Sequence, residues 1–260
     1  MFVAGYGHFL RTAASAQWDE AAVDLRPDAE AWPRLDPRLH ERIARLVAGF
    51  CVAETAVATE ILTFAAAAGD PDVAACFEAQ AVDERRHARF FDRVAAEVAG
   101  VPGDSAAQRR TALSPRLEDE FLELFEERLP AVARALAGDA PPGSLAAAVS
   151  LYHLVLEGVV FATGQLALAR LLDGGELPGL RRGTELVLRD ERWHIGLGAR
   201  LLDDLGHAAT DGAVERVLEE AETMAAAWGD AIDPELGRSV LGLHRRRLSA
   251  AGLAAAGAPA

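Results

Sequence analysis

The sequence lacks several features that would assign it to common protein classes. Lysine is absent, so all 26 basic residues of the 260-residue chain are arginines, and the formal net charge is −14 at pH 7. Such an excess of negative charge repels nucleic acid and anionic membrane surfaces, which argues against both as partners. Only two cysteines occur, Cys51 and Cys76, without a CxxC motif. Together with the lack of a secretory signal pattern at the amino terminus, this predicts a reduced, cytoplasmic location.

Aromatic residues are also few, at 6% of the chain, and alternating β-branched runs are scarce. Alanine, leucine and arginine dominate instead, with apolar residues at helical spacing, so we expect an all-α protein. The length suits one helical domain. We expect a partly helical or extended N-terminal arm at 1–36, a single ferritin-like helical domain at 37–250, and a disordered Ala/Gly tail at 251–260.

Proline and glycine mark the ends of the expected helices. We expect a connecting helix within 104–138 to be stopped or kinked at Pro130, and a loop at 138–143. The other expected helices are, in chain order, 37–69, 71–99, 144–173, 178–205, 211–228 and 233–250.

The stretch from Leu145 to Leu172 is apolar enough to resemble a membrane span. Three polar residues interrupt it, His153, Glu157 and Gln165. Because one acidic residue near the centre of a bilayer costs about 3 kcal/mol, we interpret this stretch as a buried core helix and expect no transmembrane segment.

Two copies of one short motif carry the chemistry. Val-Asp-Glu-Arg-Arg-His ends at His87, and Arg-Asp-Glu-Arg-Trp-His ends at His194. Each places a glutamate, Glu84 or Glu191, three residues before the histidine, so both side chains share one helix face and can reach one metal ion. A single copy arises easily on a solvated, charged helix face and would carry little weight.

Two isolated glutamates strengthen the metal hypothesis, because Glu54 and Glu157 interrupt otherwise apolar helical segments. Glu84 follows Glu54 by 30 residues and Glu191 follows Glu157 by 34, which indicates an internal duplication. One glutamate from each of two helices and Glu-x-x-His from two others is the ligand pattern of ferritin-like dimetal bundles. Four carboxylates facing an apolar core also require neutralising cations. The sequence therefore predicts a ferritin-like four-helix bundle core, with additional helices, that holds two metal ions.

Three stretches carry a resemblance to a known family: residues 53–57 (AETAV), 152–158 (YHLVLEG) and 189–194 (RDERWH). Over residues 16–205 the chain resembles the ribonucleotide reductase small subunit superfamily, most closely its ligand-binding oxidase branch. This resemblance implies a manganese/iron pair, with di-iron as the other option, activation of O₂, a long-chain fatty acid bound near the metals, and a homodimer. It also implies an ether cross-link between Val57 and Tyr152, and a hydrogen bond from His87 on the facing helix to Asp190.

α-Helical geometry supports one partner of that cross-link better than the other. Val57 lies one turn from Glu54, whereas Tyr152 lies about 140° around an α-helix from Glu157 and has to reach sideways. Departures from the reductase pattern argue against a working reductase subunit. Phe91 occupies the position of the radical-storing tyrosine, the tail contains no tyrosine, and the first ligand is glutamate where reductases commonly have aspartate.

Two alternative functions stay open at this point. One is a dimetal hydroxylase, desaturase or N-oxygenase acting on a separate small molecule, for which His153 is the candidate further ligand. The other is a ferritin-like metal-binding protein without catalysis. We expect the remaining histidines to be surface or hydrogen-bonded residues, with His153 the only one near the site; they are His8, His40, His153, His207 and His244. Gly158, directly after Glu157, leaves room for another group to approach.

Overall fold

The structure is a computed structural model that describes residues 4–137, 143–210 and 213–253. Within these ranges the chain is helical and contains no strand, which confirms the all-α prediction. The α-helices are α1 (Tyr6–Ser15), α2 (Arg26–Ala31), α3 (Pro37–Ala67), α4 (Pro71–Arg93), α5 (Ala106–Leu113), α6 (Asp119–Leu122), α7 (Leu129–Leu136), α8 (Ser144–Val149), α9 (Ala162–Leu171), α10 (Pro178–Thr210), α11 (Ala213–Ala226) and α12 (Pro234–Ala250). The π-helices are η3 (Val94–Val98), η5 (Glu123–Arg128) and η6 (Ser150–Phe161), and the 3₁₀-helices are η1 (Glu20–Ala22), η2 (Trp32–Arg34), η4 (Ser114–Arg116) and η7 (Gly229–Ala231).

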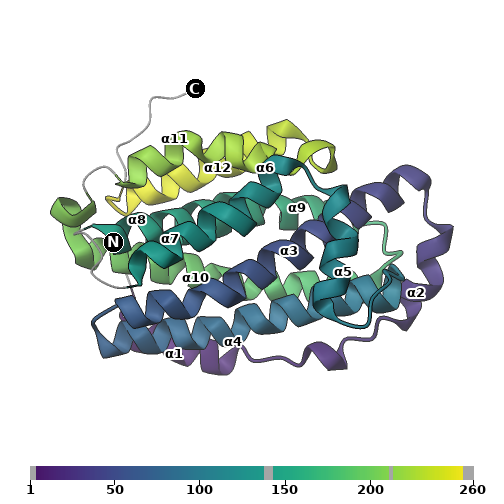
Figure 1. Ribbon diagram of the computed structural model, residues 1–260, viewed down its shortest axis with the longest axis horizontal. Coiled ribbons are helices and arrows are strands. Elements are labelled where there is room, and N and C mark those ends of the chain that lie inside the picture. Colours follow the sequence, from purple (N-terminus) through teal and green to yellow (C-terminus); the bar gives the residue numbers. More distant parts are fainter. Residues whose placement is uncertain (1–3, 138–142, 211–212, 254–260) are drawn as a thin grey trace.

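Four long helical segments form the bundle core: α3, α4, the continuous segment α8-η6-α9, and α10 (Figure 1). α3 and α4 pack along each other, α10 packs against α4 and η6, and α9 packs against α3. The residues of the short loop between α3 and α4 explain why the chain turns there. Gly69 turns the chain at φ +69°, and the Asp70 side chain accepts from the backbone N–H groups of Asp72 and Val73. Asp36 caps α3 in the same way.

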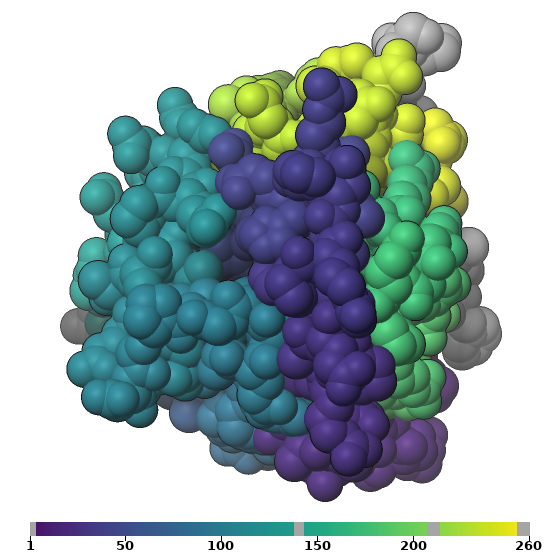
Figure 2. All heavy atoms as spheres, turned by 90° about the vertical axis from the view of Figure 1, so that its right-hand side faces the viewer, coloured from purple at the N-terminus to yellow at the C-terminus, as the bar shows by residue number. Residues whose placement is uncertain are grey.

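The segment before the bundle packs on its surface. α1 lies against α4 and α10, and α2 lies against α10. The buried Asp28 of α2 accepts from the backbone N–H groups of Gly179 and Leu180, so it satisfies free donors at the start of α10. Figure 2 shows this end of the molecule, where the purple N-terminal segment passes between the teal and green parts of the chain.

The connecting region contains Pro130, where we expected the helix to stop or to kink. The helix is not stopped there: it continues from Asp119 to Leu136, with Pro130 in the first turn of α7. The π-helix η5 directly precedes α7, so the regular α-helical hydrogen bonding with which a proline conflicts is already altered at this point. The helix begins at Asp119 because η4 and an extended Leu117 separate it from α5.

α11 and α12 pack against each other and against η6, and they cover the top of the bundle in Figure 1. In the connection between α11 and α12, the Trp228 indole packs in a tilted arrangement 5.1 Å from the Phe50 ring centroid and 4.6 Å from that of Phe121. The predicted loop at 138–143 and tail at 251–260 lie largely outside the described residues.

Two helical segments are long and apolar enough to cross a membrane by length and composition alone, Pro37–Ala67 and Ser144–Leu171. Their most apolar windows are 61% and 83% buried inside the protein. Both are core elements of the bundle, so this hydropathy reflects packing in the interior of the fold, as expected for the second of them.

Candidate metal centre

All six predicted ligands come together in the middle of the bundle. Each is at most 3% exposed. They form two groups whose ligand atoms lie within 4.8 Å of one another, and Glu84 belongs to both. The first group is Glu54, Glu84, His87 and Glu191, and the second is Glu84, Glu157 and His194. The duplicated motifs on α4 and α10 thus face each other, as the helical spacing predicts.

The first group is centred on the imidazole of His87. Its Nδ1 atom lies 3.5 Å from Oε2 of Glu54, 3.6 Å from Oε2 of Glu84 and 3.7 Å from Oε1 of Glu191. Three carboxylates from three helices therefore surround one ring nitrogen, at separations that leave the space between them for an ion.

The second group repeats this arrangement around His194. Its Nδ1 atom lies 3.3 Å from Oε1 of Glu84, 3.6 Å from Oε1 of Glu157 and 3.4 Å from Oε2 of Glu191. The carboxylate of Glu84 directs one oxygen towards each histidine, and so does that of Glu191. Both carboxylates have the geometry required to bridge two neighbouring ions.

Burial and mutual repulsion perturb the pKa values in this cluster. Burial raises the pKa of Glu54 to about 8, and it raises the pKa of Glu157 well above its usual range, with the charges of Glu191 and Glu84 adding to the effect. Burial opposes ionisation of His194, but the Glu84 charge and a hydrogen bond to Asp83 outweigh it and raise the pKa to about 10. Protons thus supply positive charge that metal ions can replace.

Buried side-chain atoms that have no hydrogen-bond partner indicate whether these residues fit a metal ion. Buried polar atoms in proteins are almost always paired. Among the described residues, ten buried side-chain atoms have no partner, and seven belong to the six predicted ligands. They are Glu54 Oε1, Glu54 Oε2, Glu84 Oε2, His87 Nδ1, Glu157 Oε2, Glu191 Oε2 and His194 Nδ1. Unpaired carboxylate oxygens and imidazole nitrogens are the donor set that dimetal bundles use, so the residues fit two metal ions.

Two aspartates orient the histidines from the far side. Nε2 of His87 lies 3.3 Å from Oδ2 of Asp190, the pair between which the family resemblance implies a hydrogen bond. Nε2 of His194 lies 3.4 Å from Oδ2 of Asp83, a residue that the sequence reasoning missed. The signal was available, because an aspartate directly precedes the glutamate in both motifs. Each aspartate supports the histidine of the opposite helix, so the two motifs are joined crosswise.

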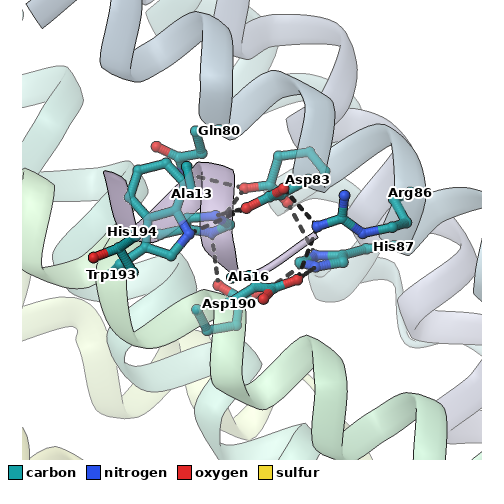
Figure 3. Close-up of polar contacts among 12 residues, drawn as sticks. Ala13, Ala16, Gln80, Asp83, Arg86, His87, Asp190, Trp193 and His194 are labelled. Carbon is teal, nitrogen blue, oxygen red and sulfur yellow. Dashed lines mark hydrogen bonds and ion pairs between the residues drawn. The ribbon is translucent and has the colours of Figure 1, made fainter. Parts of the chain in front are cut away.

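Arg86 lies between these two aspartates (Figure 3). Its buried guanidinium donates over 2.5 Å to Oδ1 of Asp83 and over 3.0 Å to Oδ2 of Asp190. Each aspartate also accepts from an indole: Asp83 from Trp193 over 3.1 Å, and Asp190 from Trp18 over 2.7 Å. Although burial raises the pKa of Asp190, its hydrogen bonds and the charge of His87 lower it overall, which keeps it an ionised acceptor.

Gln80 links His153 to the cluster. The Gln80 amide donates to Oε1 of Glu84 over 3.1 Å and to Oε1 of Glu157 over 2.6 Å, while its carbonyl oxygen lies 3.1 Å from Nε2 of His153. His153 belongs to neither group of potential ligands among the described residues. Burial lowers its pKa to about 3, so it is neutral at physiological pH.

Tyr152 enters the site because its helix is a π-helix. The sequence reasoning assumed α-helical geometry, which turns Tyr152 away from Glu157. In η6 the hydrogen bonds join residues five apart, so residues 152 and 157 lie on the same face of the helix. The Tyr152 hydroxyl donates to Oε1 of Glu84 over 3.1 Å, and its ring packs 5.2 Å from that of Phe64 on α3. Val57 is fully buried on α3, the same helix.

Cys51 and Phe91 have structural roles near the cluster. The thiol of Cys51 donates to the Phe91 carbonyl over 3.4 Å, and the Phe91 ring stacks on Phe50 at 4.7 Å. His244 is not at the surface: it is 3% exposed, and its Nε2 atom has no hydrogen-bond partner. Its ring occupies the space beside Gly158.

The four-helix core and the two carboxylate-histidine groups define a ferritin-like dimetal bundle. Comparison with known proteins gives the family. The family model for the ribonucleotide reductase small chain matches residues 6–235, and the chain belongs to this family.

Solved structures of R2-like ligand-binding oxidases have the same fold. A valine-to-leucine mutant with an anaerobically reconstituted Mn/Fe cofactor is 22% identical, with 94% of this chain and 92% of that chain covered at a TM-score of 0.80. A glycine-to-phenylalanine mutant with the same cofactor is 21% identical, with 94% and 93% covered at 0.83. A tyrosine-to-phenylalanine mutant, reconstituted aerobically with Mn/Fe, is 22% identical, with 95% and 90% covered at 0.76.

Proposed function

We propose that this protein is an O₂-activating dimetal oxidase that holds one manganese and one iron ion. The six clustered residues are the ligands, with Glu84 and Glu191 shared between the ions. The observation that carries this proposal is the set of seven unpaired ligand atoms, all directed into one buried cluster. The Mn/Fe cofactors of the similar structures support the choice of metals. Oxygen donors with one imidazole per ion suit manganese and iron equally, so a di-iron form shares the same ligands.

The surrounding residues prepare the histidines for this role. Asp190 and Asp83 accept from Nε2 of His87 and His194, which fixes the proton on Nε2 and leaves the Nδ1 lone pair of each ring directed at the cluster. Arg86 and the two indoles hold the aspartates ionised and in place. The apolar core around them excludes water, which strengthens every charge interaction at the site.

Val57 and Tyr152 are the residues that we propose to be oxidised. Forming an ether between the Tyr152 oxygen and the Val57 Cβ removes one hydrogen atom from each, a two-electron oxidation. When bound, the metal ions supply O₂ binding and the other two electrons of its reduction to water. The hydrogen bond from Tyr152 to Glu84 supports this role, because it gives the phenolic proton an acceptor within the site. The Phe64 contact brings the ring to the helix of Val57.

A long-chain fatty acid is the proposed ligand, with its carboxylate at the metals and its chain among apolar residues of the bundle. Two points support it: the similar structures are named ligand-binding oxidases, and the cluster lies in an apolar core. A homodimer in the cytoplasm completes the proposal. The negative net charge and the two unpaired, buried thiols of Cys51 and Cys76 are consistent with that compartment.

The deciding experiment is peptide mass mapping of protein prepared with manganese and iron, one sample kept anaerobic and one exposed to air. We expect the Val57 and Tyr152 peptides to be joined, and lighter by two hydrogens, only after exposure to air. Tyr152→Phe is the control, because it keeps the ring and removes the oxygen that forms the ether. Separate peptides in an air-exposed protein with two bound metals would overturn the cross-link. A hydroxylase, desaturase or N-oxygenase acting on a separate substrate would then be the leading function, and metal loading without O₂ consumption would indicate metal binding alone.

A further inference from the structure

Two ring side chains from the C-terminal part of the chain reach into η6, the π-helix that carries Tyr152 and Glu157. Trp228 follows α11, and its Nε1 donates over 2.9 Å to the Val160 carbonyl. His244 lies on α12, and its ring lies against the backbone at Gly158. Both rings are buried, at 2% and 3% exposed. The C-terminal part of the chain therefore contacts the second half of η6, at Gly158 and at Val160.

Glycine residues make room for these rings. A Cβ atom built on Gly158 would lie 2.6 Å from Cε1 and 2.7 Å from Nε2 of His244, closer than real Cβ atoms come to other atoms. A Cβ on Gly164, just after η6, would likewise overlap the Trp228 indole. The rings thus pack directly on the helix backbone, where a side chain on either glycine would displace them.

A π-helix of this length needs such support. π-Helices are rare, and most are single turns within α-helices. η6 extends over 12 residues, all of them buried, so contacts with other elements must offset its intrinsic preference for the α-helical form. Its hydrogen bonding also has a consequence at the cluster. In the π-helical form, residues 152 and 157 share one face; in an α-helix, Tyr152 would turn away from Glu84.

We propose that Trp228 and His244 are positioning residues: they hold η6 in its π-helical form and thereby hold Tyr152 and Glu157 at the metal centre. The C-terminal helices α11 and α12 are then part of the construction of the site. The inference rests on the proposed function only where it treats Glu157 as a metal ligand. The π-helical form itself depends on neither metal nor O₂.

The first test is His244→Ala in the full-length chain, with Leu243→Ala as the matched control, because Leu243 neighbours it on α12 and is 43% exposed. Hydrogen exchange of metal-free protein compares the peptide covering residues 150–161 with a peptide from α4. We expect amides in 150–161 of His244→Ala to exchange about tenfold faster or more, as when a buried contact over a locally opening segment is lost. Exchange in α4, and in the Leu243→Ala protein throughout, should match the original protein.

A double-mutant cycle with Gly158→Ala makes the test specific. The added methyl group alone should also accelerate exchange in 150–161, because it displaces the His244 ring. When Gly158→Ala is combined with His244→Ala, the added methyl group enters the space that the ring vacated. The acceleration of exchange in the double mutant should therefore differ from the product of the two single-mutant accelerations by about threefold or more. Trp228→Phe, which keeps a ring and removes the donor to Val160, gives an independent readout at a second contact with η6 if His244→Ala does not fold.

Metal titration with Mn(II) and Fe(II) under anaerobic conditions tests the positioning role. His244→Ala should bind metal at least about tenfold more weakly than Leu243→Ala, a loss typical of residues that orient metal ligands. Unchanged exchange in 150–161, or purely multiplicative effects in the cycle, would overturn the support of the π-helix. Faster exchange with unchanged metal affinity would overturn the positioning of Glu157. If the original protein itself failed to bind two metals, the proposed function would fail, while the exchange data would still decide the role of His244.

Discussion

Oδ2 of Asp83 on α4 lies 3.4 Å from Nε2 of His194 on α10, and Asp190 on α10 faces His87 on α4 at 3.3 Å in the same way. Each Asp-Glu-x-x-His motif therefore supplies two ligands to the cluster and orients the histidine of the other motif. Loss of either aspartate should disturb a ligand on the opposite helix rather than on its own.

Asp83→Asn and Asp190→Asn should each weaken metal binding about tenfold to a hundredfold, because the amide no longer acts as an ionised acceptor for its histidine. Calorimetric titration with Mn(II) under anaerobic conditions measures this loss. Asp92→Asn is the control on α4, since Asp92 pairs with Arg109 away from the cluster. Equal affinity in Asp83→Asn and Asp92→Asn would show that the hydrogen bond of Asp83 to His194 has no part in metal binding.

Gln80→Leu should destabilise the metal-free protein by about 1–3 kcal/mol, because it leaves Glu157 and His153 with buried polar atoms that have no partner. Chemical denaturation in the presence of a chelator measures the change in the free energy of unfolding. In metal-loaded protein the cost should be smaller, since an ion takes over the Glu157 carboxylate. The same cost in both forms would contradict the assignment of Glu157 as a ligand.

The metal-free protein should become less stable as pH rises above neutrality. The folded state holds protons on Glu54, with a pKa of about 8, and on His194, with a pKa of about 10. Both values are raised, so the stability from these groups is present at low pH and is lost as pH rises through about 8 and then about 10. Glu84, with a pKa lowered to about 2, contributes the opposite trend only below about pH 4.5.

Thermal unfolding at pH 6.5 and at pH 9 measures this effect. With a chelator, the melting temperature should be lower at pH 9. With Mn(II) and Fe(II) under anaerobic conditions it should depend less on pH, and metal affinity should be higher at pH 9 because binding competes with protons. A metal-free melting temperature that rises from pH 6.5 to pH 9 would contradict the protonated state of the cluster.

The residue pattern predicted which carboxylates and histidines cluster, but not the geometry around Tyr152. Glutamates in apolar stripes and Glu-x-x-His on helices follow the α-helical period, so Glu54, Glu84 and Glu191 could be placed from spacing alone. η6 could not, because its 12 residues would suit an α-helix equally well, and its π-helical form depends on contacts made by residues some 70 to 90 positions later in the chain. His244 was misread for the same reason: its burial follows from tertiary packing, which no local pattern reports.

Gly49→Ala should destabilise the protein by about 1–3 kcal/mol through overpacking. A Cβ at position 49 on α3 would overlap the buried Trp228 ring, which fills the space against α3 and packs on Phe50. The matched control is Gly242→Ala on α12, where the added Cβ would lie 3.6 Å from an Arg246 nitrogen atom at the end of a flexible side chain. There, replacing a helical glycine should leave stability unchanged or raise it by up to about 1 kcal/mol. Chemical denaturation of both variants measures the difference. If Gly49→Ala were as stable as Gly242→Ala, Trp228 would have freedom to move, and the tight packing of the C-terminal helices on the bundle would be wrong.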